Sequence, residues 1–107
     1  MNTTKPEQNI FEELGLPDAK ELEVKSQLAI RLLRVMRERK LTQAQTAKIT
    51  GLSQPRISDM IRGRWHGVSE MAFMECLNAL GEDIEIVIHK HKAKQPYAPG
   101  RTAVTYA

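Results

Sequence analysis

The stretch LTQAQTAKITGLSQPRISDMIRG, residues 41–63, decides the fold. It contains two short helical patterns on either side of Gly51, and each pattern begins with its own cap. Thr42 followed by Gln45 is a capping box, in which each side chain accepts a hydrogen bond from a backbone amide of the other residue. Ser53 is the second N-cap. We therefore predict two short helices joined by a turn in which Gly51 takes a positive φ.

Such a helix pair buries little surface, and its usual purpose is to project the outer face of the second helix into a groove the size of the DNA major groove. The small Ala47 falls where the two helices cross, and Ile57 points back into the angle between them. Together with Gln43, Gln54 and the run LNALG at 77–81, this pattern resembles the helix-turn-helix of the Xre family, the lambdoid phage-repressor type. The wider arrangement, residues 10–89, is similar to the short Xre-type antitoxins of the HigA kind.

The resemblance implies an all-α, lambda-repressor-like helix-turn-helix domain of about four to five helices, to which the sequence adds one C-terminal β-strand. It also implies a repressor of its own operon that neutralises a RelE-like ribonuclease toxin in a type II toxin–antitoxin pair. The chain departs from the family at Thr46 and Thr50, where apolar residues are usual, so the first helix of the motif should pack less tightly. Met36 and Ile61 stand where some phage repressors carry a buried ion pair, an exchange that need not harm folding.

Four segments follow along the 107-residue chain: an N-terminal extension with a short helix (1–17), the helix-turn-helix domain (18–83), a dimerisation strand (84–89) and a flexible basic tail (90–107). Asp18 with Glu21 is a capping box that begins a long helix, which we expect to reach about Lys40. Its predicted core positions are Leu22, Leu28, Leu32, Val35 and Met36. Residues 65–67 form a connecting loop. Ser69 caps a fourth helix, in which Val68 and Phe73 pack together and the inner stripe is Met71, Met74, Leu77 and Leu80.

Residues 84–89, IEIVIH, are typical of a β-strand, with Ile84, Ile86 and Ile88 on one side. A single strand among helices has no partner, and so hydrophobic an edge would aggregate. The economical solution is a second copy across a two-fold axis, so we predict a homodimer with these three isoleucines in its interface. Two alternatives remain open: pairing with residues 102–106 of the same chain, or with the sheet edge of a partner protein.

Charge is strongly segregated although the net charge is only +3. Residues 1–23 carry −4, residues 24–64 carry +8 from ten basic and two acidic side chains, and residues 65–107 carry −1. Basic charge thus coincides with the helix-turn-helix and the helix before it, as in a phosphate-binding face. A dimer would read a palindromic operator in double-stranded DNA, with half-sites about 34 Å apart.

The second helix of the motif should carry the base contacts. Gln54 can pair with adenine, Arg56 can fork onto guanine or grip a phosphate, and Asp59 can accept from cytosine. The resemblance implies that Gln43 holds a phosphate while it braces Gln54. The full set of predicted phosphate contacts is Thr42, Gln43, Ser53, Ser58, Arg62 and Arg64.

Several other classes of function are not expected. His66, His89 and His91 form no catalytic constellation, and no Gly-rich phosphate loop appears, so we predict neither an enzyme nor a cofactor. His89 and His91 are spaced to share a metal but lack further ligands, and we predict no metal site. No run of apolar residues could span a membrane, no signal peptide begins the chain, and the single Cys76 excludes an internal disulfide. We therefore expect a cytoplasmic protein.

Overall fold

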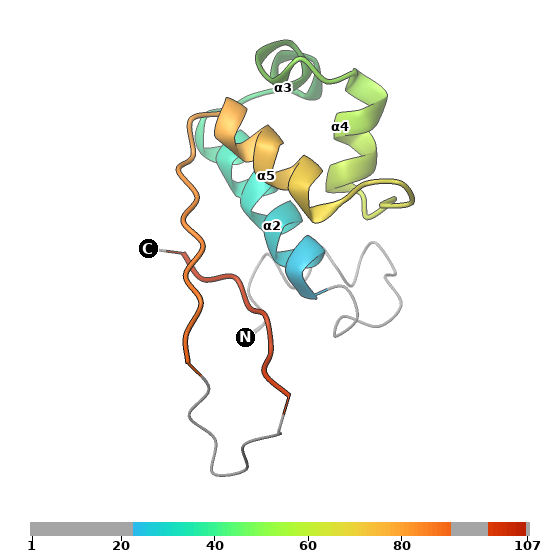
Figure 1. The fold of residues 1–107 in the computed structure, drawn as a ribbon. Helices are drawn as coiled ribbons and strands as arrows, with labels where there is room; N and C mark the ends of the chain where they lie inside the picture. The colour runs from blue at the N-terminus through green and yellow to red at the C-terminus, as the bar shows by residue number, and fades with distance from the viewer. Residues whose placement is uncertain (1–22, 91–98, 107) are drawn as a thin grey trace, which may run out of the picture.

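A computed structural model of the chain describes residues 23–90 and 99–106. It contains four helices in these ranges, namely α2 (Glu23–Glu38), α3 (Gln43–Thr50), α4 (Gln54–Ile61) and α5 (Glu70–Ala79). The two longest, α2 and α5, lie side by side and run in the same direction, while α3 lies near the C-terminal ends of this pair and α4 lies along its side (Figure 1). The all-α class is confirmed for this part of the chain. The short helix in 1–17 and the Asp18–Glu21 capping box lie outside the described residues.

The core lies between α2, α4 and α5. The α2 residues Leu28, Leu32, Val35 and Met36 are 0–6% exposed, which confirms these four positions of the predicted stripe. The fifth, Leu22, lies outside the described residues. In α5 the inner face is Phe73, Cys76, Leu77 and Leu80, each 2% exposed or less. The prediction that Met71 belongs to the inner stripe of α5 is wrong, because 56% of this residue is exposed. At 3.6 residues per turn it lies two residues, or about 200°, from Phe73, and Cys76 fills the inner position instead.

The caps of the motif form as the sequence predicts. The Thr42 hydroxyl accepts from the Gln45 amide at 3.0 Å, and the Gln45 side-chain oxygen accepts from the Thr42 amide at 2.9 Å. Ser53 accepts from the Arg56 amide at 3.2 Å. Gly51 has φ 77°, a conformation that only glycine adopts without strain. These features fix where α3 begins and ends and where α4 begins.

The two threonines of α3 satisfy their own hydroxyl groups. Thr46 is fully buried, and its hydroxyl donates to the Thr42 carbonyl at 2.9 Å. Thr50 donates in the same way to the Thr46 carbonyl at 2.8 Å. Because these hydroxyls bond within the helix, a threonine can occupy an apolar position without leaving an unpaired polar group in the core.

Helix α2 ends at Glu38, two residues before the expected end at Lys40. Lys40 has φ 54°, and the Leu41 amide donates to the Met36 carbonyl at 2.8 Å. This is the arrangement of a Schellman motif, which closes a helix with one left-handed residue. The sequence gives no sign of it, because glycine is the usual residue there.

Trp65, which the sequence assigns to a loop, is part of the core. It is 6% exposed, and its indole Nε1 donates to the Met60 carbonyl at 2.8 Å. Its ring meets Phe73 edge-on, with centroids 5.8 Å apart and planes at 89°. The residue therefore joins the end of α4 to the body of α5.

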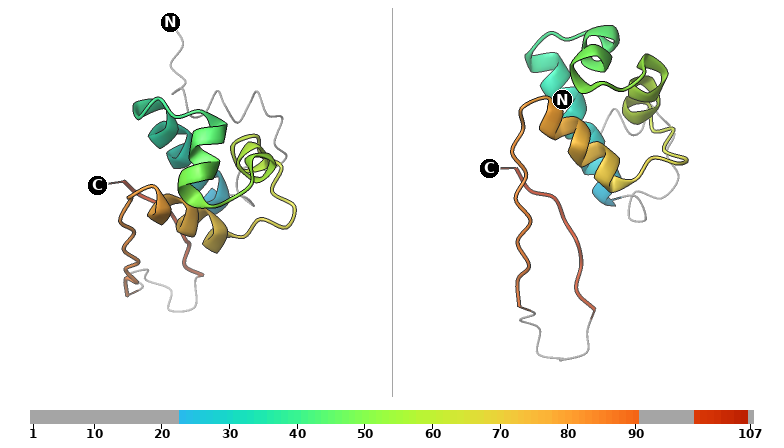
Figure 2. Two further views of the ribbon diagram at one scale, coloured as in Figure 1. Left: turned by 90° about the horizontal axis from the view of Figure 1, so that it is seen from above. Right: turned by 45° about the horizontal axis from the view of Figure 1, so that its top comes forward.

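The C-terminal strand is not formed in the single chain, and neither described range contains a strand. Residues 84–90 extend on the side of the α2–α5 pair opposite α4 (Figure 2). The exposed fraction rises from 36% at Ile84 to 72% at Ile86 and 92% at Ile88. A strand is defined by the ladder it makes with a neighbour, and the described part of this chain supplies no such neighbour.

The returning end of the chain, one of the two alternative strand partners, binds α2 instead. The Val104 amide donates to the Gln27 side-chain oxygen at 2.7 Å, and the Tyr106 hydroxyl donates to the Gln27 carbonyl. Arg31 lies over the Tyr106 ring, 5.3 Å from its centroid. The end of the predicted flexible tail is thus seated on the helical body, while residues 91–98 lie outside the described part.

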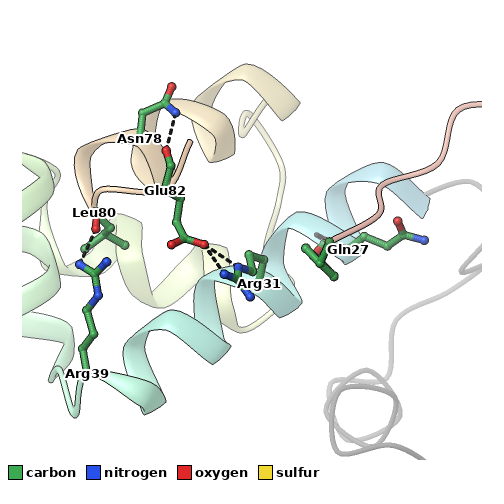
Figure 3. Close-up of polar contacts among 7 residues, drawn as sticks. Gln27, Arg31, Arg39, Asn78, Leu80 and Glu82 are labelled. Carbon is green, nitrogen blue, oxygen red and sulfur yellow. Dashed lines mark hydrogen bonds and ion pairs between the residues drawn. The ribbon is translucent and has the colours of Figure 1, made fainter. Parts of the chain in front are cut away.

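The same face of α2 is tied to the end of α5 (Figure 3). Arg31 binds the Glu82 carboxylate, with 2.6 Å between Nε and Oε1, and Arg39 donates to the Leu80 carbonyl. Asn78 donates to the Glu82 carbonyl at 3.0 Å. These contacts set the point at which the extended segment leaves the body. Within the described ranges, no helix has both the length and the apolar character needed to cross a membrane.

Candidate nucleic-acid interface

Helix α4 has one buried and one open face. Ile57 and Met60 are fully buried and Ile61 is partly buried against the core. On the other sides of the helix Gln54 and Arg62 are exposed, and Ser58 and Asp59 are partly exposed. The open face therefore carries a carboxamide, a hydroxyl, a carboxylate and a guanidinium within two helical turns. These groups can donate to and accept from base edges and phosphates.

Three predicted phosphate contacts lie at the starts of α3 and α4. The Thr42 and Ser53 hydroxyl oxygens are occupied as acceptors by the capping amides, which leaves each hydroxyl proton free to donate. Gln43, the first residue of α3, is partly exposed. Helix N-termini favour anions because unpaired amides and the helix dipole point at them. The two starts are therefore suited to phosphate groups.

The structure does not join Gln43 to Gln54. Among the described residues neither side chain makes a hydrogen bond, so the expected bracing is absent from this free chain. Gln54 is exposed at the first turn of α4. Both amides remain able to turn toward a ligand.

Arg56 is held away from the open face. Its Nη2 donates to the Gly67 carbonyl at 3.2 Å, so the guanidinium lies against the connection between α4 and α5. A base contact by Arg56 would require this bond to be exchanged. That role stays a prediction.

Asp59, Ser58 and Arg64 form one group. The Arg64 Nε donates to Asp59 Oδ1 at 2.8 Å, and its Nη2 donates to the Ser58 hydroxyl at 3.2 Å. The side chains of Arg64 and Asp59 are 61% and 41% exposed. The sequence assigned Asp59 to a base and the other two to phosphates without foreseeing that they bind one another. The spacing of a carboxylate and a guanidinium five residues apart across a helix end was the available signal.

The basic charge of residues 24–64 is used in two ways. Arg31 and Arg39 bind acceptors at the end of α5, and Lys25 lies 3.8 Å from the Glu70 carboxylate. Arg62, at the C-cap of α4, is exposed and has no partner among the described residues. Part of the charge therefore holds the fold together. The remainder of the exposed cations is available to a polyanion; these are Arg37, Lys40, Lys48 and Arg62.

The described part of the chain contains no candidate metal site and no reactive cysteine. Residues 23–90 and 99–106 hold no cluster of three His, Cys, Asp or Glu side chains that could bind a metal. Cys76 is 2% exposed, and burial raises the pKa of its thiol to about 11. The thiolate is the reactive form, so this cysteine is a poor nucleophile.

Comparison with known proteins agrees with this geometry. Residues 10–89 match the family model of a helix-turn-helix domain. A solved structure described as a "Putative XRE Family Transcriptional Regulator" is 37% identical, with a TM-score of 0.74 over 85% of this chain and 100% of that chain. No curated protein matches this chain. Neither matching description is that of an enzyme.

Proposed function

Because this chain belongs to the XRE-type family of helix-turn-helix transcriptional regulators, we propose that it is a sequence-specific repressor that binds double-stranded DNA. The open face of α4 carries the proposal: Gln54, Asp59 and Arg62 are accessible on a helix whose opposite side is fixed by the buried Ile57 and Met60. A helix fits the major groove, where the pattern of donors and acceptors distinguishes all four base pairs. Such a protein would act in the cytoplasm, beside the chromosome.

Base choice and general affinity are assigned to different residues. Gln54, at the start of α4, is placed to reach a base edge, and adenine is the base that a carboxamide pairs with bidentately. Thr42, Gln43 and Ser53 would position the phosphate backbone on one side, and Arg62 would do so on the other. Phosphate contacts give affinity that falls with salt, whereas base contacts give selectivity.

A binding titration of two variants tests this division. The wild-type chain, Gln54→Ala and Arg62→Ala are titrated with duplexes from the region upstream of the gene at several salt concentrations. Gln54→Ala should relax base preference at one position per half-site, by about 1–3 kcal/mol. Arg62→Ala should weaken every duplex alike and reduce the salt slope by about one. Equal losses on all sequences for both variants would refute the division.

The proposal includes a homodimer formed through Ile84, Ile86 and Ile88. Two observations support it: these side chains are exposed in the single chain, and the extended backbone that carries them has no ladder. Two copies paired antiparallel would cover both the side chains and the strand edges. The dimer would then meet a palindromic operator with half-sites about 34 Å apart.

Sedimentation of a charged variant tests the dimer. Ile86→Lys should give a monomer, and truncation after Glu82 should do the same. Met71→Lys is the matched control, because Met71 is an exposed apolar residue of similar accessibility outside the segment. If the truncated chain still sediments as a dimer, the interface lies elsewhere.

We further propose, from the resemblance to HigA-type antitoxins, that the repressor belongs to a type II toxin–antitoxin pair with a RelE-like toxin. The acidic segment 1–23, which carries −4, would suit a basic ribonuclease. A short basic reading frame next to the gene, and co-purification of its untagged product, would support this role. A regulator that acts without a toxin is one alternative, and purification of this chain alone from cells that express both frames would favour it. The other is a protein-interaction module that retains the fold without operator binding, which the absence of salt-sensitive binding to upstream DNA would favour.

A further inference from the structure

Arg64 lies over the open face of α4, although it belongs to the turn that follows the helix. Its guanidinium bridges Asp59 Oδ1 at 2.8 Å and the Ser58 hydroxyl at 3.2 Å. These two residues are consecutive, so their side chains project about 100° apart around the helix axis. Both are partly exposed, while their neighbours Ile57 and Met60 are fully buried. A guanidinium that spans the two therefore sits on the solvent side of α4.

The backbone that carries Arg64 is fixed as well. Its amide donates to the Asp59 carbonyl at 3.0 Å. The next residue, Trp65, is buried and bonds the Met60 carbonyl at 2.8 Å. The guanidinium of Arg64 is thus bound by two side chains, and the backbone of Arg64 is fixed by the turn. An arginine restrained in this way loses little conformational freedom on binding a ligand.

The two contacts occupy one particular edge of the guanidinium. Arginine has five N–H donors in a planar fork. Asp59 and Ser58 take the edge formed by Nε and Nη2, which leaves the edge formed by Nη1 and Nη2 free. A free two-nitrogen edge matches the O6 and N7 acceptors of guanine in the major groove.

We propose that Arg64 reads a guanine through Nη1 and Nη2, and that Asp59 and Ser58 are positioning residues that aim its guanidinium. The inference rests on the proposed DNA binding and adds a guanine to each half-site, at the base pair facing the C-terminal half of α4. It replaces the direct base contact expected from Asp59. A phosphate is the less suitable ligand, because the Asp59 carboxylate beside the guanidinium repels a fully charged anion more than the partial charges of a base edge.

Selection from a pool of duplexes with a randomised centre tests the assignment. The wild-type chain and Arg64→Lys are each mixed with the pool, and the bound fraction is sequenced. Lysine keeps the charge but lacks the fork. Preference for guanine at one position per half-site should fall roughly tenfold, with the other positions unchanged. Arg101→Lys is the matched control, because Arg101 is an exposed arginine outside every predicted DNA contact, and it should leave every base preference as it is.

A second variant tests the positioning role. Asp59→Ala frees the guanidinium to reach phosphates and removes a negative charge from the interface. The guanine preference should fall several-fold while affinity for all duplexes rises and the salt slope steepens by about one. A surface ion pair without this role would leave base preference unchanged. Circular dichroism confirms that each variant is folded.

The outcomes separate this inference from the proposed function. Wild-type binding with salt dependence, together with an unchanged guanine preference in Arg64→Lys, would overturn the guanine assignment alone. A uniform loss across all duplexes in Arg64→Lys would also overturn it, and would make Arg64 a phosphate contact. If the wild-type chain bound no duplex in a salt-dependent way, both the inference and the proposed repressor would be wrong.

Discussion

The substitution of Trp65 offers the sharpest test of how α4 is held. The indole contributes its buried volume at 6% exposure, an edge contact with Phe73 at 5.8 Å and a hydrogen bond to the Met60 carbonyl. Trp65→Ala removes all three, and such truncations in a core cost about 3–5 kcal/mol. Trp65→Phe keeps a ring near Phe73 but leaves the Met60 carbonyl without its donor, which should cost about 1–3 kcal/mol.

Thermal unfolding monitored by circular dichroism measures the loss of stability in both variants. Fluorescence cannot serve, because Trp65 is the single tryptophan of the chain. Trp65→Ala should lower the melting temperature by about 12 °C or more, and Trp65→Phe should fall between it and the wild type. His66→Ala, an exposed neighbour in the same loop, should stay within about 0.5 kcal/mol. The account is refuted if Trp65→Ala is as mild as His66→Ala, or if Trp65→Phe is the more damaging of the two tryptophan variants.

Substitutions at three further residues test local features of the fold. Lys40→Gly should raise the free energy of unfolding by about 0.5–1 kcal/mol, because glycine takes φ 54° without steric cost, a gain partly offset by its greater backbone entropy; a lower melting temperature would contradict this. Thr42→Ala should lower that free energy by about 1 kcal/mol through loss of the α3 cap, whereas Thr42→Ser should retain the cap. Burial raises the pKa of Cys76 from 9.0 to about 11, so the native thiol should resist iodoacetamide at pH 8.5. Between pH 9 and 11 the unfolded thiol loses its proton while the buried thiol keeps it, so this residue makes the free energy of unfolding fall over that range. In Cys76→Ala the free energy of unfolding should therefore fall less steeply with pH than in the wild type. An equal fall in the two proteins would contradict this.

The motif was predictable because its determinants are local. The caps at Thr42 and Ser53 involve residues within one helical turn, and the positive φ of Gly51 depends on the turn alone. The stripes of α2 followed for a similar reason, since a period of 3.6 residues fixes which side chains share a face. The prediction for Met71 was wrong because it assigned this residue to the buried face of α5, although the helix itself was predicted in the right place.

The roles of the arginines were not predictable in the same way. Arg31 and Glu82 are 51 positions apart, and Arg56 meets a carbonyl 11 positions away, so both contacts exist only once the helices have packed. A count of charges along the sequence cannot separate these arginines from those that are free to bind phosphate. Burial of Trp65 also depends on the packed fold, although an isolated aromatic residue two positions after Gly63 was a signal for it.

The C-terminal segment shows a different limit. The alternation of Ile84, Ile86 and Ile88 encodes which face of a strand is apolar, and nothing in it encodes what covers that face. The Gln27 side-chain oxygen accepts from the Val104 amide and its backbone carbonyl accepts from the Tyr106 hydroxyl, so the most obvious partner within the chain is engaged on α2 rather than beside the isoleucines. Exposure that increases away from the body, to 92% at Ile88, is what a segment shows when the chain folds without the surface that completes it. For this reason the identity of that surface has to come from association measurements, and a second copy is the partner whose strand edge matches this one by symmetry.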